Sequence, residues 1–218
     1  MKHNDIFPKG YMLIVLVSVI MLFAENGKNE GDKATLTVVG FVNELEDSSW
    51  QDARIGMGLQ AILSELFYAS NEFALVEEKD AIKEEIRKTA SLLWATGDKG
   101  KKIKEITEKA SRDTRFLAWG RVFYFGRPRD KTSLGPMQIT RDAVVIKVEV
   151  TLRDQKKKKN YIAVGKGVSA TTAASILFTF HEKELQLDKT NVGNATREAL
   201  EMAVNSLMKK YRKKYKRD

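Results

Sequence analysis

The sequence predicts an α/β (α+β) fold, in which helices pack on a mixed sheet that contains a long antiparallel hairpin. Two observations predict it. In the first half of the chain, short apolar runs alternate with segments whose apolar residues recur at helical spacing. In the second half, a long segment has an apolar residue at every second position and is followed by a lysine-rich turn and another strand. That pattern is typical of a hairpin with one buried face.

The first expected strand covers residues 35–42 and leads through a polar loop into a helix. Ser48 or Ser49 is the expected N-cap of this helix, and Gln51 stands where it completes a capping box with Ser48. The apolar residues of the helix form one continuous stripe, which comprises Ile55, Leu59, Ile62, Leu63, Leu66 and Phe67. We therefore expect the helix to bury this stripe.

Two further helices and a short strand are expected before the aromatic part of the chain. The strand lies at 73–78, and the helix after it at 79–96. The apolar face of that helix comprises Ile82, Ile86, Leu93 and Trp94. A glycine- and lysine-rich break separates it from a shorter helix at about 101–111.

The rest of the chain is expected to form strands and a final helix. A strand lies within 114–128, the hairpin covers 138–172, and a strand-like stretch follows at 175–187. In the first arm of the hairpin, one face carries Val144, Ile146, Val148, Val150 and Leu152, and the other carries Arg141, Lys147, Glu149 and Thr151. The final helix, at about 192–211, has an inner face of Val192, Ala195, Ala199, Met202, Ala203 and Leu207.

Residues 1–24 have the composition of an export signal. Lys2 and Lys9 lie within the first ten residues. Residues 11–24 then form an uncharged run of 14 residues, and the polar residues 25–33 follow as a linker. Fourteen helical residues span about 21 Å, less than the roughly 30 Å of a bilayer core. The segment is either a signal peptide cut after Ala24 or a retained membrane anchor. Both alternatives predict that the remaining chain works in the periplasm or at the outer membrane.

The formal net charge of this 218-residue chain is +9, and two basic runs contribute much of it. The first run is the expected hairpin turn, and the second spans the end of a domain at 34–211 and a basic tail at 212–218. The candidate anion-binding residues are Lys156, Lys157, Lys158, Lys159, Lys209, Lys210, Arg212, Lys213 and Lys214. Such runs favour anionic lipid, nucleic acid or an acidic protein surface, or they are simply solvated. The expected export disfavours nucleic acid.

The sequence contains no motif that indicates a catalytic, cofactor-binding or metal site. Gly40 stands alone after the first strand, whereas a dinucleotide-binding turn needs several glycines there. The two histidines, His3 and His181, are not at metal-ligand spacing, and the chain has no cysteine. We therefore expect a protein that is not an enzyme, holds no cofactor and is not a lipoprotein.

Two other features have a structural interpretation. Gly56 and Gly58 flank Met57 on the first helix, where they are expected to permit close packing against a neighbour or in an assembly. The strand within 114–128 interleaves aromatic and basic residues, a mixture that would suit single-stranded nucleic acid. The aromatic residues are Phe116, Trp119, Phe123, Tyr124 and Phe125, and the basic residues are Arg115, Arg121, Arg127 and, just after the strand, Arg129. Given the expected export, we interpret this segment as a core strand with polar ends.

Several segments in order resemble the CsgG-type family of curli-production assembly and transport proteins. The opening TLTVVGFVN and the later FALVEE are similar to that family's strands of the types VAVLPF and FxVVER. TRFLAWGRVFYF resembles ADYLVxGxV, and VVIKVEVTLRDQ with the turn after it resembles VxLRLVDxxTGxV. The closing NATREALEMAVNSLMKKY looks like the family's final helix, so the resemblance covers about residues 35–211.

The resemblance implies an α/β domain like the N-terminal domain of TolB-like proteins, in a self-associating protein of the bacterial envelope. It implies a non-enzymatic component that supports secretion or assembly of a surface structure through protein partners. The alternatives are a monomeric periplasmic regulator of a cell-wall synthase and a basic module that binds anionic lipid or nucleic acid. Pore-forming relatives carry a lipidated cysteine and two long membrane hairpins. This chain departs from them in both respects, because it has no cysteine and its segments 126–143 and 171–189 are short or charged.

Overall fold

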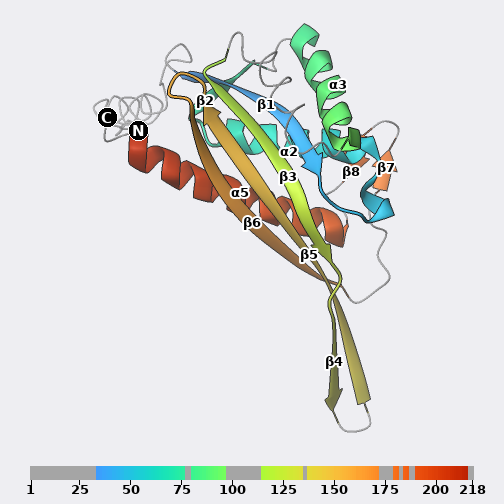
Figure 1. Ribbon diagram of the computed structural model, residues 1–218. Helices are drawn as coiled ribbons and strands as arrows, with labels where there is room; N and C mark the ends of the chain where they lie inside the picture. Colours follow the sequence, from blue (N-terminus) through green and yellow to red (C-terminus); the bar gives the residue numbers. More distant parts are fainter. Residues whose placement is uncertain are drawn as a thin grey trace, which may run out of the picture. The chain divides into compact units, whose positions relative to one another are not determined.

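The computed structural model describes residues 33–76, 80–96, 114–134, 137–171, 179–181, 184–186 and 190–215 (Figure 1). The expected export segment, nearly all of the linker, the helix at 101–111 and the last three residues of the basic tail lie outside these ranges. In chain order the elements are β1 (Ala34–Asn43), η2 (Ser48–Trp50), α2 (Ala53–Ala69), β2 (Phe73–Leu75), α3 (Asp80–Thr96), β3 (Phe116–Gly126), β4 (Arg129–Leu134), β5 (Met137–Asp154), β6 (Lys159–Thr171), β7 (Thr179–His181), β8 (Glu184–Gln186) and α5 (Asn191–Tyr215).

The main sheet is mixed, which confirms the predicted fold class. Its strand order is β2-β1-β3-β5-β4, and β6 pairs with β5. β1 runs parallel to β2 and β3, whereas β5 is antiparallel to β3, β4 and β6. The predicted hairpin is confirmed as β5 and β6, in a register that runs from Asp154 opposite Lys159 to Asp142 opposite Thr171.

β5 is long enough to pair with two successive strands along one edge. β3 pairs with it from Asp154 to Val145, and β4 continues from Asp142 to Met137. The charged segment between β3 and the body of β5 therefore forms a hairpin of its own. Figure 1 shows this β4–β5 hairpin extending beyond the other strands of the sheet.

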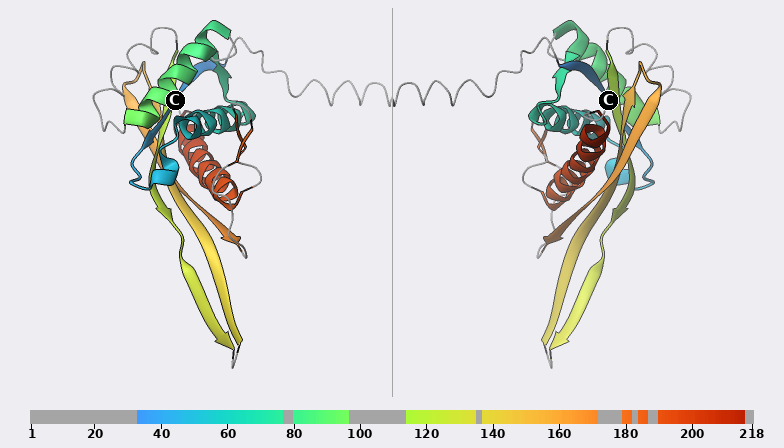
Figure 2. Two further views of the ribbon diagram at one scale, coloured as in Figure 1. Left: turned by 90° about the vertical axis from the view of Figure 1, so that its right-hand side faces the viewer. Right: turned by 90° about the vertical axis from the view of Figure 1, so that its left-hand side faces the viewer.

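Helices cover both faces of the sheet. α2 and α5 lie beside each other on one face (Figure 2), where the ion pair of Arg197 with Glu65 joins them at 3.2 Å. The apolar residues of β5 at 144, 146, 148, 150 and 152 are all buried on this face, as the alternation predicts. α3 covers the other face near β1, where Leu93 packs with Val39, Val42 and Leu117. Thr151 also faces away from α5, but it is buried between its cross-strand neighbours Trp119 and Ile162.

The start of the first helix differs from the prediction. Ser48 and Ser49 lie in a 3-10 turn whose N-cap is Asp47, and α2 begins at Ala53 with Asp52 as its N-cap. The turn is needed because Trp50 is fully buried, and its carbonyl accepts a hydrogen bond from Trp94 Nε1 at 2.8 Å. The predicted capping box is also wrong.

Asp52 stabilises the first turn of α2 through its carboxylate. Its Oδ1 accepts the backbone N–H of Arg54 at 2.9 Å, and the Arg54 guanidinium pairs with the same carboxylate. The hydrogen bond from the Arg54 side chain holds the pKa of Asp52 below its usual range. Such a carboxylate stabilises the fold above its unfolded pKa and loses that contribution as the pH falls through its folded pKa.

The final helix also differs from the prediction in two respects. α5 continues to Tyr215, so that Arg212, Lys213 and Lys214 are helical rather than part of a tail. Met202, which was predicted to face inward, is 46 % exposed. Because successive helical residues are about 100° apart, the buried stripe that passes through Ala199, Ala203 and Leu207 also takes in Leu200, Val204 and Met208, and it leaves position 202 outside.

α5 lies against β6 so closely that glycines are required in the strand. A Cβ at Gly165 would lie 1.8 Å from the carbonyl oxygen of Ala199, and one at Gly167 would lie 1.7 Å from that of Ala195. Both obstacles are backbone atoms, which cannot move aside as a flexible side chain can. Small residues on both elements therefore permit direct contact between the helix backbone and the strand.

We expect Gly167→Ala to lower the free energy of unfolding by about 2 kcal/mol, because the helix must move away from the strand. The measurement is chemical denaturation of the purified full chain. Lys166→Ala is the matched control, because Lys166 is the exposed neighbour on the same strand. Equal stabilities of the two variants would contradict the close contact.

We expect Asp52→Ala to lower the free energy of unfolding by about 1 kcal/mol at neutral pH, the usual cost of removing an N-cap. The loss should disappear in acid, as the pH falls below the normal carboxyl range and through the depressed pKa of Asp52. Ser48→Ala serves as the control and should change little. A larger loss for Ser48→Ala than for Asp52→Ala would indicate that Ser48 is the N-cap of the helix, as the sequence predicts.

Candidate anionic-partner surface

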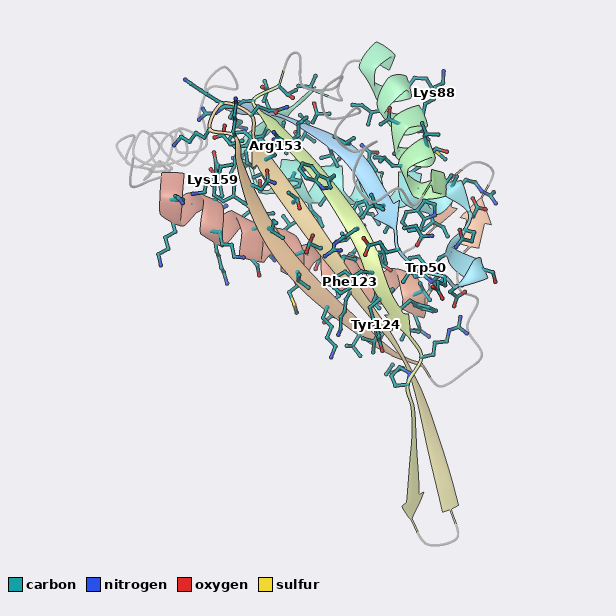
Figure 3. All side chains as sticks on the ribbon, viewed as in Figure 1. Trp50, Lys88, Phe123, Tyr124, Arg153 and Lys159 are labelled. Atoms are coloured by element: carbon teal, nitrogen blue, oxygen red, sulfur yellow. The ribbon has the colours of Figure 1, made fainter. Side chains whose placement is uncertain are left out.

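The structure brings the two predicted basic runs together at one end of the sheet. Lys156, Lys157 and Lys158 lie in the turn between β5 and β6, and the second run forms the last turns of α5. The Lys210 ammonium donates a hydrogen bond to the carbonyl of Ile162 at 2.7 Å. In Figure 3, Lys159 lies beside the C-terminal end of α5. We call the nine predicted residues together the basic end.

An aromatic cluster fixes the end of α5 against the sheet. The Tyr211 ring lies 5.2 Å from Phe73, 5.7 Å from Phe116 and 6.5 Å from Tyr161, measured between ring centroids. These rings come from α5, β2, β3 and β6, and none is more than 7 % exposed. Edge-to-face and tilted contacts of this kind add to the free energy of burial. The positions of Lys209–Lys214 are therefore set by a packed core beneath them.

A buried aspartate shapes the turn that carries the first run. Asp154 is fully buried, and its Oδ1 accepts the backbone N–H of Lys157 at 2.9 Å. The Arg115 guanidinium lies 3.9 Å from the other carboxylate oxygen. The turn also places Lys158 at φ 50°, a left-handed conformation that L side chains rarely adopt. This role of Asp154 could not be predicted from the sequence, because its position at the end of β5 resembles an ordinary polar strand end.

The charge at this end remains strongly positive after its ion pairs are considered. Two carboxylates accompany the cations in the described part of the chain, and each lies beside an arginine. They are Asp154 near Arg115 and Glu72, whose Oε1 is 2.8 Å from Arg212 Nε. Lys156, Lys158, Lys209, Lys213 and Lys214 are all exposed. The surface has the charge that anionic partners need.

The two predicted glycines, Gly56 and Gly58, have different surroundings in the structure. Gly56 lies under α3, where an added Cβ would be 2.5 Å from Trp94 Cβ. Gly58, two residues further along α2, is half-buried. Gly56 thus has a contact within the chain that accounts for a small residue, and a role of either glycine in an assembly stays a prediction.

Most of the aromatic residues of β3 belong to the core. Phe116 is buried, and Phe125 packs on Trp50 at 5.3 Å. Arg121 lies between two carboxylates, 3.0 Å from Glu149 Oε1 and 3.2 Å from Glu44 Oε2. The hydrogen bond with Glu149 raises the pKa of Arg121, which keeps the ion pairs charged. Arg121 lies in the middle of β3 rather than at an end, and Tyr124 is 42 % exposed. The interpretation as a core strand with polar ends therefore fits only part of β3.

A row of exposed β-branched residues on β6 is a feature that the sequence analysis missed. Ile162, Val164 and Val168 are 45 %, 50 % and 46 % exposed. The alternate residues Tyr161, Ala163, Gly165 and Gly167 are buried against α5. The sequence contains an indication of this row. Small residues at alternate positions of β6 mark the face that a helix covers, and the large residues between them must then lie on the other face. We call the side of the sheet that carries Ile162, Val164 and Val168 the outer face.

Two other kinds of functional site, a pocket and a metal site, have less support in the described residues. A shallow pocket is lined by Asp47, Ser49, Phe125, Gly126 and Arg127. Hydrogen bonds from Ser49 lower the pKa of Asp47 there. Within the described ranges, no three acidic, histidine or cysteine side chains gather as a metal site. Across those same residues, no helix is both long and apolar enough to cross a membrane.

Comparisons with known proteins give distant structural similarities. No family model and no curated protein matches the chain. Lipoprotein GNA1162 from Neisseria meningitidis is 13 % identical over 65 % of this chain and 86 % of that one, with a TM-score of 0.41. The hypothetical protein CT253 from Chlamydia trachomatis is 8 % identical over 82 % and 95 %, with a TM-score of 0.45. A PelC dodecamer from Paraburkholderia phytofirmans is 11 % identical over 80 % and 88 %, with a TM-score of 0.41. These similarities assign neither a family nor a function.

We expect Lys158→Gly to raise the free energy of unfolding by about 0.5–1 kcal/mol, because glycine adopts the left-handed conformation without a steric cost. Lys157→Gly removes the same charge from the same turn and is the matched control, which should be neutral or destabilising. Thermal and chemical denaturation of the three proteins would compare them. Equal gains in both variants would assign the effect to charge repulsion instead.

Proposed function

We propose that this chain is a non-enzymatic component of the bacterial envelope that self-associates and supports secretion or assembly of a surface structure, as CsgG-type proteins do. The observation that carries self-association is the exposed apolar row of the outer face. Ile162, Val164 and Val168 stand on one strand, each about half exposed. Ile162 and Val164 are neighbours on this face, and the exposed Lys166 separates them from Val168. Exposed apolar residues that gather on one face are typical of protein interfaces.

The surroundings of this row support a face-to-face contact with a second copy. Across the sheet from Val164 lie Glu149 and then Arg121, which pair with each other. An apolar row bordered by a charged network has the composition of an interface with an apolar centre and a polar rim. The occupant we propose is the same face of another copy, because that face supplies both the apolar and the charged groups needed.

The free edge of β6 is less suited to assembly than its face. Val168 donates its backbone N–H to Glu198 Oε2 at 2.7 Å, and the Ile162 carbonyl accepts from Lys210. Charged side chains of α5 thus occupy two of the edge groups that a further strand would need. Such protection is a common way to prevent strand addition. Copies would therefore meet through side chains of the outer face.

The ionisable groups support a non-enzymatic role. Among the described residues, the pKa values of Asp47, Asp52, Arg54 and Arg121 are shifted, and hydrogen bonds in caps or ion pairs cause these shifts. Shifted groups that converge in a cleft would instead indicate catalysis. The envelope location is supported by the uncharged run at 11–24, and the type of component by the ordered CsgG-like segments.

The first test is the native mass of the protein extracted from its own membranes or periplasm in mild detergent, with the mature N-terminus determined in the same sample. We expect a uniform assembly that Val164→Asp dissociates, because a carboxylate in the apolar row must lose its hydration. Asn194→Asp makes the same change of charge at an exposed position of α5, on the opposite side of the sheet, and should leave the mass unchanged.

Either of two results would overturn self-association through this face. One is a folded wild-type monomer, which would favour the monomeric regulator of a cell-wall synthase. The other is an assembly that persists in Val164→Asp while that variant stays folded.

A further inference from the structure

We propose that the basic end is a membrane-docking surface that binds anionic lipid headgroups and turns the start of β1 and the end of α5 toward the bilayer. This inference rests on the proposed envelope location, but not on self-association. It goes beyond that proposal because it assigns the basic end a ligand and the domain an orientation.

The surface is built from two segments that are distant in the sequence. The β5–β6 turn and the first residue of β6 contribute Lys156–Lys159, and α5 contributes Lys209–Lys214 fifty residues later. The contact between Tyr211 and Tyr161 holds the two segments side by side. Each basic residue near an anionic surface strengthens binding by roughly fivefold, and the effect extends only about one Debye length. Lysines gathered at one end can therefore act on the same membrane surface together.

The chain enters the domain at this same end. Along the sheet, Leu36 of β1 pairs with Phe116, Phe116 pairs with Asp154, and Asp154 pairs with Lys159 at the turn. β1 begins at Ala34, only two residues before Leu36. In the sequence, nine residues separate Ala34 from Ala24 at the end of the uncharged run. Ten peptide steps reach at most about 35 Å, so a retained anchor would keep the first residue of β1 within that distance of the bilayer.

The side chains at this end favour lipid over single-stranded nucleic acid. Nonspecific recognition of nucleic acid combines basic residues with exposed aromatic rings that stack on bases. Here the rings of Phe73, Phe116, Tyr161 and Tyr211 are at most 7 % exposed. The exposed cations are mainly lysines, which act as mobile point charges, whereas arginine supplies the planar fork that recognises phosphate in a fixed geometry. A fluid layer of headgroups suits such lysines.

The absence of cysteine from the chain allows a direct measurement of orientation. Asn160→Cys places a fluorescent donor beside the basic turn, and Asn194→Cys places one in the first turn of α5, and both positions are exposed. The seventeen helical steps from Asn194 to Tyr211 span about 25 Å. Energy transfer to headgroup-labelled lipid is measured on full-length protein with vesicles of phosphatidylcholine, with or without phosphatidylglycerol. We expect more transfer from position 160 than from 194 on anionic vesicles, and loss of this difference on neutral vesicles or at high salt.

A matched pair of charge variants tests which lysines are responsible. Lys156→Gln with Lys213→Gln removes one lysine from each run, and Lys88→Gln with Arg127→Gln removes two exposed cations elsewhere. We expect the first pair to weaken salt-sensitive binding to anionic vesicles by about tenfold or more, and the control pair by much less. Folding is checked by far-ultraviolet circular dichroism of each variant.

Three results would overturn the proposal. They are equal losses in the two pairs, equal transfer from positions 160 and 194 on anionic vesicles, and tighter binding to an oligonucleotide than to vesicles of equal phosphate concentration. The last result would assign the basic end to nucleic acid. Because binding to vesicles is measured apart from native mass, failure of this proposal is distinguishable from failure of self-association.

Discussion

The contact between the backbone of α5 and the glycines of β6 is the constraint on which much of the structure depends. Gly165 and Gly167 bring the strand against the carbonyls of Ala199 and Ala195. This contact decides which side of β6 is buried, because the glycine side must face the helix. The β-branched residues at the alternate positions are then necessarily on the outer face. The apolar row there is thus a consequence of the way in which the helix is seated.

The same contact determines where the charge of the chain gathers. Once Ala195 and Ala199 lie over Gly167 and Gly165, the direction of α5 along β6 is set, and its last turns must reach the β5–β6 turn. Tyr211 then fills the space among Phe73, Phe116 and Tyr161. Two basic runs that repel each other are held together because this aromatic burial outweighs a repulsion that solvent and salt screen.

The sequence predicts those parts of the fold that depend on periodicity. The alternation along residues 144–152 predicted both the strand and its buried face, and the hairpin partner followed from the lysine-rich turn. The N-cap of α2 could not be predicted in this way, because it depends on burial of Trp50 against Trp94, which is 44 residues away. The exposure of Met202 could not be predicted for a similar reason, since it depends on which residues beside the helical stripe face the sheet. For the site, the composition of the basic end was predictable, but its assembly from two distant segments depends on tertiary packing.

β6 connects the two proposed surfaces through one strand. Its outward residues form the apolar row, and its first residue, Lys159, belongs to the basic end. Three half-exposed β-branched residues offer a small apolar area, which by itself would give a weak contact between copies. Docking of the basic end would confine copies to a membrane surface with their sheets in a common orientation, and it would raise their effective concentration. On these proposals, a weak lateral contact and a weak electrostatic contact strengthen each other without any further contact being made.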